Sequence, residues 1–395
     1  MTHDITRPYL VDIFQVTGGE THDYHLRGGL GTDQDQLLPA DDLAQVTALP
    51  LTPIDEQPTL SSDPNDWLGP APMLEGSEVW DVDNPTDNSC YGLLRRMAQG
   101  VATEDFTLNY KYIDGSNLGS RHHVVQNESM EVFLGQSPRL RQLNEDDDSI
   151  GHILDEKVYN EWTPHLVLRT EGDPVTHSTT FIVVHEPYSS STPNDMVVTQ
   201  FETGAPTQIG LKVEMGDRVD TYLLSLGDAQ EMSASGLTVD GIIGVHTTDG
   251  VDEYGWLVGG TSLEKGSVSL SSATGHYEGS IQSGMIEFLG EESDSFDATS
   301  SLPEGTSLSE GILHVTHGTS IDGEKHFIEH VDQDPIIHAY PIESVESLGS
   351  TTQRIHLDGN HGLLIDGNIT RERHFPDLTF EGINTFKVYT NVYGP

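Results

Sequence analysis

The chain has 395 residues, of which 64 are acidic and 18 basic, so its formal net charge is -46 at neutral pH. A surface this negative repels nucleic acid and anionic membranes, and we exclude both as partners. The length allows one large domain or two to three ordinary ones, with a substantial buried core.

The acidic residues are spread along the whole chain, and Lys is rare. This composition is typical of folded proteins that work in molar salt, where carboxylate repulsion is screened, so we expect a halophilic source rather than an ordinary acidic protein. The single cysteine, Cys90, excludes an intrachain disulfide. No apolar segment follows Met1 and no run approaches ~20 apolar residues, so we expect a soluble chain without an export signal or membrane span.

The opening stretch, residues 9–29, reads YLVDIFQVTGGETHDYHLRGG. Alternating aromatic and β-branched residues predict a strand, Gly18 and Gly19 break it, and a second strand follows. On that strand His22 and Tyr24 share one face, and Asp23 and His25 the other. Asp12 falls on the apolar face of the first strand, where a carboxylate needs a partner.

Two interpretations of this stretch stay open. In the first it is a hairpin with a polar corner, in which His22 and His25 cap turns and Asp12 binds backbone amides. In the second it is a polar surface for a hydroxylated or acidic ligand, because its side chains donate and accept hydrogen bonds and two of them titrate near neutral pH.

Beyond the opening stretch, frequent Gly and Pro and short alternating runs predict many short strands. Residues 30–66 are polar and proline-rich, which predicts a long loop rather than a strand pair. Residues 90–100, CYGLLRRMAQG, are the one good helical candidate. Residues 106–112 alternate as a half-buried strand, and residues 165–172 and 179–189 are predicted to pair with each other.

We therefore predict an all-β fold. A large antiparallel β-sandwich (a supersandwich) covers residues 1–274, and a smaller C-terminal β-sheet domain covers residues 275–395, where the strand pattern tightens. No fixed-period repeat is visible, which disfavours a propeller or a β-solenoid.

Motifs for several chemistries are absent from the sequence. We find no glycine-rich phosphate loop, no paired-cysteine zinc site, no His-Glu-x-x-His and no Gly-x-Ser-x-Gly. His122 and His123 are adjacent, so on a strand they face opposite ways, and His314 and His317 also fall on opposite faces. The sequence therefore predicts no metal site.

Three segments carry a resemblance to a known family. The opening stretch is similar to the pattern "YVVDVFRV-GG-HDW-HG" in the β-domain of heparinase II/III-like polysaccharide lyases, with Tyr24 in the aromatic position. Residues 162–172, WTPHLVLRTEG, and 181–188, FIVVHEPY, look like a later strand pair that ends in Glu-Pro-Tyr. The looser likeness runs through nearly the whole chain, but only the opening stretch and Glu186-Pro187-Tyr188 are specific.

The resemblance implies a β-supersandwich with a small terminal β domain that works, beside an (α/α) toroid, on acidic polysaccharide. In the family the toroid supplies the Tyr and His that abstract a proton, and upstream strands supply a zinc site of two His and one Asp. Both precede the stretch that matches here, and Met1 stands eight residues before Tyr9. We therefore expect a truncated or split lyase chain with no catalytic residue, metal or cofactor of its own.

The first alternative is a carbohydrate-binding or structural β-protein, and the second is a complete lyase that uses His22, Tyr24 and His25. The expected partners are an acidic polysaccharide or oligosaccharide, a separately encoded toroid domain, and a second copy of the chain if an apolar face is exposed. The candidate substrate-binding residues are Asp12, His22, Tyr24, His25, Arg27, Arg169 and Glu186.

Overall fold

The fold is all-β. The computed structural model describes residues 7–28, 44–47, 49–53, 95–111, 118–138, 162–285, 294–305, 307–308, 311–320, 337–359, 361–372 and 379–395. Within these ranges thirty strands and no helix occur. None of the described segments could cross a membrane as a long apolar helix. The prediction of an all-β fold is therefore confirmed.

The chain divides into two compact units, residues 1–194 and 195–395. The boundary that we predicted at residue 275 falls inside the second unit, one residue before β20 begins at His276.

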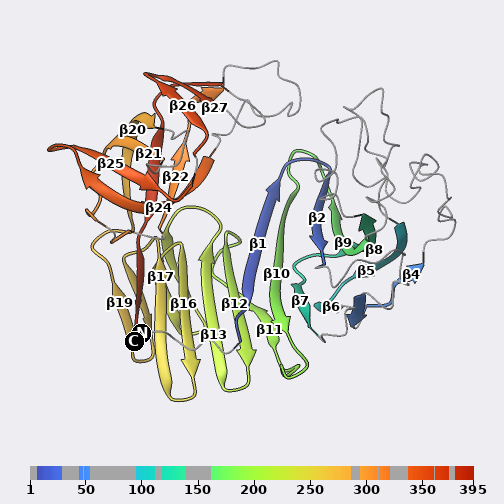
Figure 1. Cartoon of the computed structure of the whole chain (residues 1–395). Coiled ribbons are helices and arrows are strands. Elements are labelled where there is room, and N and C mark those ends of the chain that lie inside the picture. The colour runs from blue at the N-terminus through green and yellow to red at the C-terminus, as the bar shows by residue number, and fades with distance from the viewer. Residues whose placement is uncertain are drawn as a thin grey trace, which may run out of the picture. The chain divides into compact units, whose positions relative to one another are not determined.

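The first unit is a sandwich of two antiparallel five-stranded sheets (Figure 1). Sheet A has the order β1-β10-β7-β6-β3, with β1 (Leu10–Thr17), β10 (Ser178–Tyr188), β7 (Gly119–Val125), β6 (Phe106–Lys111) and β3 (Ala44–Thr47). Sheet B has the order β2-β9-β8-β5-β4, with β2 (Thr21–Arg27), β9 (Trp162–Glu171), β8 (Met130–Pro138), β5 (Arg95–Ala102) and β4 (Thr52–Pro53).

Some consecutive strands of this unit pair with each other, such as β6 with β7 and β8 with β9, but β1 and β2 lie in different sheets, as do β9 and β10. β1 pairs with β10, whereas β2 pairs with β9, so the turn at Gly18 and Gly19 carries the chain from sheet A to sheet B. Both glycines have positive φ, and their amides donate to the carbonyls of His177 and Pro174 in the β9–β10 crossover. The hairpin interpretation of the opening stretch and the predicted pairing of residues 165–172 with 179–189 are therefore wrong.

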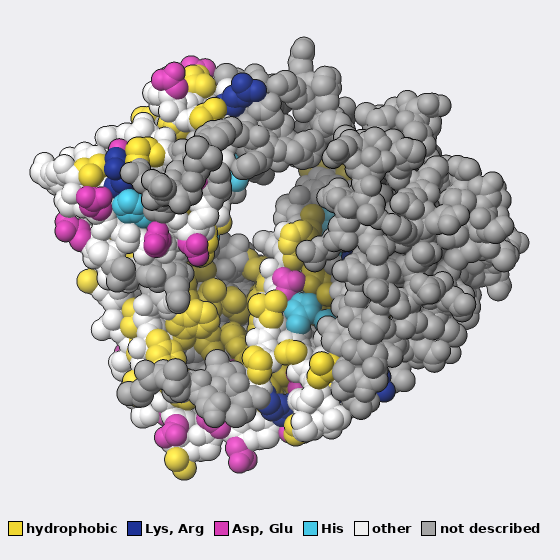
Figure 2. All heavy atoms as spheres, in the orientation of Figure 1, with side chains coloured by type: hydrophobic (Ala, Val, Ile, Leu, Met, Phe, Trp, Pro, Cys, Tyr) yellow, Lys and Arg dark blue, Asp and Glu magenta, His cyan; other side chains and the backbone are white. Residues whose placement is uncertain are grey.

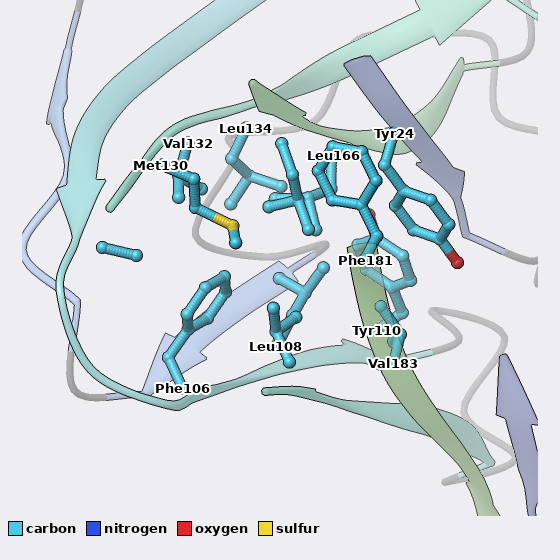
Figure 3. Packing of buried hydrophobic residues seen from close by; sticks show 13 residues of the cluster. Tyr24, Phe106, Leu108, Tyr110, Met130, Val132, Leu134, Leu166, Phe181 and Val183 are labelled. Atoms are coloured by element: carbon cyan, nitrogen blue, oxygen red, sulfur yellow. The ribbon is translucent and has the colours of Figure 1, made fainter. Parts of the chain in front are cut away.

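The core of the first unit lies between its two sheets (Figure 3). Phe106, Leu108 and Tyr110 point inward from β6, as the alternation of this strand predicts, and Leu166 and Leu168 of β9 meet them from sheet B. Tyr24 is the inward residue of β2 at the margin of this core. The core therefore fixes which face of β2 carries Tyr24.

The structure contradicts two sequence predictions, the helix at residues 90–100 and the strand-free loop at residues 30–66, at or beside the sheet edges. Residues 95–100 of the expected helix belong to β5, which pairs with β8, and residues 90–94 lie outside the described ranges. A Cβ at Gly100 would lie 2.9 Å from the side chain of Leu51 and from the backbone of Pro50, so the strand packs closely at this position. These tertiary contacts outweigh the helical spacing of three apolar residues on which the helix prediction rested. Within the expected loop, β3 pairs with β6 and β4 with β5. Apart from residues 44–47 and 49–53, the segment 30–66 lies outside the ranges that the structure describes.

The second unit begins with a second pair of stacked sheets. Sheet C has the order β11-β12-β13-β16-β17-β30, with β11 (Val197–Phe201), β12 (Gln208–Met215), β13 (Arg218–Ser225), β16 (Ile243–Asp249), β17 (Asp252–Val258) and β30 (Asn391–Gly394). Sheet D has the order β14-β15-β18-β19, with β14 (Gln230–Ala234), β15 (Leu237–Gly241), β18 (Ser262–Lys265) and β19 (Val268–Ser271). Leu223, Leu257 and Leu263 form the core between them.

A closed barrel follows, in the order β20-β21-β25-β24-β22-β29. Its strands are β20 (His276–Met285), β21 (Ser295–Thr299), β25 (Thr352–Leu357), β24 (Ile337–Ser347), β22 (Ile312–Thr316) and β29 (Thr385–Tyr389). A four-stranded sheet accompanies it, with β23 (Thr319–Ser320), β28 (Thr379–Glu381), β27 (Ile369–Glu372) and β26 (Leu363–Asp366). After the barrel, β30 returns to sheet C beside β17.

Candidate functional site

The candidate site lies where the edge strands β1 and β2 meet at one margin of the first unit. The Tyr24 hydroxyl donates a 2.6 Å hydrogen bond to Asp12 Oδ2 and so links sheet B to sheet A. Tyr24 is buried, whereas the Asp12 side chain is 39% exposed. The carboxylate that the sequence placed on an apolar face has the partner it requires, and part of it still faces solvent.

Two histidines extend this contact along sheet A. His185 of β10 has its Nε2 atom 3.7 Å from Asp12 Oδ2, and its Nδ1 lies 2.7 Å from Nδ1 of His122 on β7. His122 Nε2 in turn lies 2.8 Å from Ser120 Oγ. A contact between two ring nitrogens requires that one carries a proton and the other does not. The chain Tyr24–Asp12–His185–His122–Ser120 is therefore a continuous polar row beside the core.

Burial sets the protonation of this row. Burial, with repulsion from His185 and His123, lowers the pKa of His122 to about 3. Burial also lowers the pKa of His185, against the opposing charge of Asp12. Burial, then the hydrogen bond and the charge of Asp12, raises the pKa of the Tyr24 phenol. At neutral pH the imidazoles are uncharged and the phenol keeps its proton, so the row can form hydrogen bonds between neutral rings and offers no phenolate base.

Exposed apolar side chains lie next to Asp12 on the same face of β1. Leu10 is 63% exposed and Phe14 is 48% exposed, because β1 is an edge strand. The expectation that this face is buried is therefore wrong at both positions. Figure 2 shows hydrophobic, acidic and histidine side chains gathered over β1 and β10. An apolar ring can pack against the C–H face of a sugar, and a carboxylate and an imidazole beside it can form hydrogen bonds with the sugar hydroxyls.

His22 is separate from this site. Its ring is 3% exposed and stacks on His177 with centroids 3.8 Å apart. Its Nε2 donates to the carbonyl of Gly18, and its Nδ1 lies 3.1 Å from Thr179 Oγ1. His22 therefore fixes the crossover between β1 and β2, and it is the structural part of the opening stretch.

His25 and Arg27 lie on the opposite face of β2 from Tyr24. His25 Nδ1 is 3.0 Å from Nε2 of His165 on β9, and burial lowers the pKa of His25. Burial, with repulsion from His25 and Arg27, lowers the pKa of His165 to about 3. The structure thus distributes His22, Tyr24 and His25 over three surroundings and does not bring them together as one catalytic group.

Arg169 is paired with Asp23 on that same outer face of sheet B. Its Nε and Nη2 atoms donate to the two Asp23 oxygens over 2.8 and 2.6 Å, in a bidentate ion pair. The guanidinium also lies 5.8 Å from the centre of the Phe133 ring. Because Arg169 is only 6% exposed, this arrangement holds β9 against β2 and leaves little surface for a ligand.

Glu186 lies on the other face of sheet A and is 1% exposed. Arg7 donates to its Oε1 over 2.7 Å and Arg121 to its Oε2 over 2.8 Å, while His123 Nε2 is 3.5 Å away. Burial raises the pKa of the carboxyl, but the hydrogen bonds from His123, Arg7 and Arg121 prevail and lower it to about 2. Glu186 therefore anchors the segment before β1 rather than a ligand.

A divalent ion is implied only for the complete family architecture. Among the described residues, no three His, Cys, Asp or Glu side chains converge as ligands of one ion. His122 and His185 direct ring nitrogens at each other, and Asp12 is hydrogen-bonded to Tyr24. These residues do not fit a metal in this arrangement, and we derive no chemistry through one.

Sequence reasoning missed His122, His185 and Ser120 as members of the site. The alternation of β10 places His185 on the face of Phe181 and Val183, which is a usable signal. The pairing of His122 with His185 depends on the register of β7 against β10, and no local pattern gives that register. Neither the scan against protein-family models nor the search of curated proteins found a match to the chain.

Proposed function

We propose that this chain is the β-sheet portion of a heparinase II/III-like polysaccharide lyase and that its own role is to bind saccharide. The observation that carries the proposal is the Tyr24–Asp12 hydrogen bond beside the exposed Phe14 ring. Asp12 and His185 are suited to sugar hydroxyls, and Phe14 to an apolar sugar face. The polymer class, an acidic polysaccharide, comes from the sequence resemblance alone.

Elimination by this chain alone is not part of the proposal. A base must reach the proton beside the uronate carboxyl, and the two ring systems nearest to Asp12 are poor bases. The Tyr24 phenol has a raised pKa, and burial lowers the pKa of the His185 imidazole. We propose that the base comes from an (α/α) toroid outside these 395 residues.

Calorimetric titration with heparan sulfate and alginate fragments in molar KCl tests the proposal. We expect weak binding, no rise in the ultraviolet absorbance of unsaturated uronate, and weaker binding by the Phe14→Ala and Asp12→Asn variants. Val175→Ala is the matched control, because Val175 is 83% exposed and lies in the β9–β10 crossover. Binding that the Phe14 and Asp12 changes leave intact would refute the site.

Two further outcomes separate the alternatives. Absence of binding to every polymer would favour a structural β-protein. Cleavage of a polymer by the intact chain, abolished in His25→Ala, would favour the complete lyase. We expect His22→Ala to lower thermal stability without changing affinity, because His22 contacts the crossover and not the exposed edge.

A further inference from the structure

A row of aromatic side chains lies on one face of sheet C in the second unit. Trp256 of β17 and Tyr393 of β30 are directly opposite each other in the strand pairing. Tyr254 lies two residues before Trp256, and its ring centre is 5.8 Å from that of Tyr393. Leu257 and Val392 point to the opposite side, into the core against sheet D, so strand alternation places the three rings on the face turned away from sheet D.

Two of these three rings are exposed, and Tyr254 is half-buried. Trp256 is 41% exposed and Tyr393 is 50% exposed. Among the described residues, three of the exposed large hydrophobic side chains are aromatic. They are Trp256, Tyr393 and, in the first unit, Phe14. Two of the three thus form one neighbouring pair on sheet C.

Polar groups hold and border the aromatic row. The Trp256 indole N–H donates to the side-chain oxygen of Asn391, which fixes the edge of the ring. Arg218 forms an ion pair with Asp220 over 2.9 Å, and Asp220 is fully buried. Burial raises the pKa of Tyr254 and that of Tyr393, and the positive charge of Arg218 opposes this rise at both phenols. The face therefore combines apolar rings with hydrogen-bonding groups, as a surface that binds a sugar requires.

Charge decides between the possible occupants. Asp249 and Asp252 are exposed and directly opposite each other at one end of the row, so this face carries more carboxylates than cations. These carboxylates repel an anionic polymer. A second copy of the chain that docked through this same face would bring its own Asp249 and Asp252 against these carboxylates. An uncharged saccharide has no such penalty, and its C–H faces match the rings.

We propose that Tyr254, Trp256 and Tyr393 form a binding platform for an uncharged oligosaccharide. This platform is independent of the site at Asp12 and Phe14, because it lies in the other unit and uses other strands. Adjacent strands are about 4.8 Å apart, so rings on β17 and β30 can contact successive parts of one saccharide chain.

The test is a titration of the full chain in molar KCl with four uncharged probes: cellohexaose, xylohexaose, laminarihexaose and N-acetylated chitohexaose. We expect at least one probe to bind and to change the tryptophan fluorescence. Trp256→Ala and Tyr393→Ala should each weaken that binding about tenfold. Trp256→Phe, which keeps a ring, should weaken it less.

Two controls assign the effect to the platform. Val251→Ala changes a 96% exposed residue in the β16–β17 turn, and Phe14→Ala changes the other site. Neither should alter affinity for the uncharged probe. Circular dichroism of both ring variants verifies that each one folds, and because the two changes lie on different strands, one variant suffices if the other does not fold.

Three outcomes would overturn the proposal. The first is no binding of any uncharged probe, and the second is binding that both ring variants retain. The third is a dimer, measured by light scattering, that Trp256→Ala converts to a monomer, because the rings would then bind another copy of the chain. Loss of saccharide binding in Phe14→Ala alone would also overturn the proposal, because the uncharged probe would then bind at the first site and not at the platform.

Discussion

The Tyr24 hydroxyl and the Asp12 carboxylate join two sheets through one hydrogen bond of 2.6 Å at the edge of the sandwich. No backbone ladder connects these strands, because β1 pairs with β10 and β2 with β9. This side-chain hydrogen bond therefore connects the two strands at this edge, as backbone hydrogen bonds connect neighbouring strands inside each sheet.

Removal of the Tyr24 hydroxyl should lower the free energy of unfolding. We expect Tyr24→Phe to cost about 1–2 kcal/mol, toward the lower end for a bond to a charged group because Asp12 is partly exposed to water. Urea unfolding of Tyr24→Phe, Asp12→Ala and the double variant measures the coupling between the two residues. A coupling energy below about 0.3 kcal/mol would show that the bond does not contribute.

Acid should destabilise the first unit through its paired histidines. His122 and His165 have folded pKa values of about 3, below the unfolded value of about 6.5, so the folded state favours their neutral forms. Their contribution is complete above about pH 6.5 and is lost as pH falls from there toward 3. Each contributes a slope of up to about 1.4 kcal/mol per pH unit in that window.

Unfolding free energies between pH 8 and pH 5 at constant salt measure this slope. His122→Gln should reduce it, whereas His276→Gln should not, because His276 is a 40% exposed side chain on β20. An equal slope in the His122→Gln variant and the unaltered chain would contradict the assignment.

The ion-pair cluster around Glu186 should be sensitive to the loss of its acid. Glu186→Ala leaves Arg121 buried without its carboxylate, and we expect a loss of about 3–5 kcal/mol. The folded pKa of Glu186 is about 2, below its usual 4.5, so its stabilisation is present above pH 4.5 and is lost between 4.5 and 2. Glu231→Ala, on an exposed position of β14, is the control for guanidinium unfolding. Equal midpoints for both variants would refute a structural role for Glu186.

Salt should stabilise the whole chain by screening its net charge of -46. The screening length falls from about 30 Å at 0.01 M salt to about 3 Å at 1 M, so carboxylate repulsion fades across this range. We expect the melting temperature to rise steeply with KCl and less with sucrose, which stabilises by exclusion and does not screen. A melting temperature that is the same in dilute buffer and molar KCl would disprove this prediction.

The sequence was informative where structure is local. Alternation in residues 106–110 correctly predicted the inward face of β6, and the paired glycines correctly marked the end of β1. Pairing partners were not predictable, because a crossover between sheets and a hairpin both begin with a strand, a glycine turn and another strand. The opening stretch therefore read as a hairpin although its strands belong to different sheets.

The site was predictable only in part for the same reason. Asp12 stood out because it is a carboxylate on the apolar face of a strand, and Tyr24 because it fills the aromatic position of the family pattern. His122 and His185 are 63 residues apart in sequence, and they meet through the register of β7 against β10. The residue pattern of a single sequence gives no information about which distant residues such a register brings into contact.

The return of β30 to sheet C has a consequence for synthesis. The Trp256 indole meets Asn391, which is 135 residues later, so β17 is made long before its outer neighbour exists. During that interval β17 is an unprotected sheet edge, which is a common starting point for misassociation between nascent chains. Closure of the barrel, with β29 ending at Tyr389, brings the chain back and shortens the loop that β30 must close. A ribosome that stalls within the barrel would thus release a chain whose earlier sheet is still open.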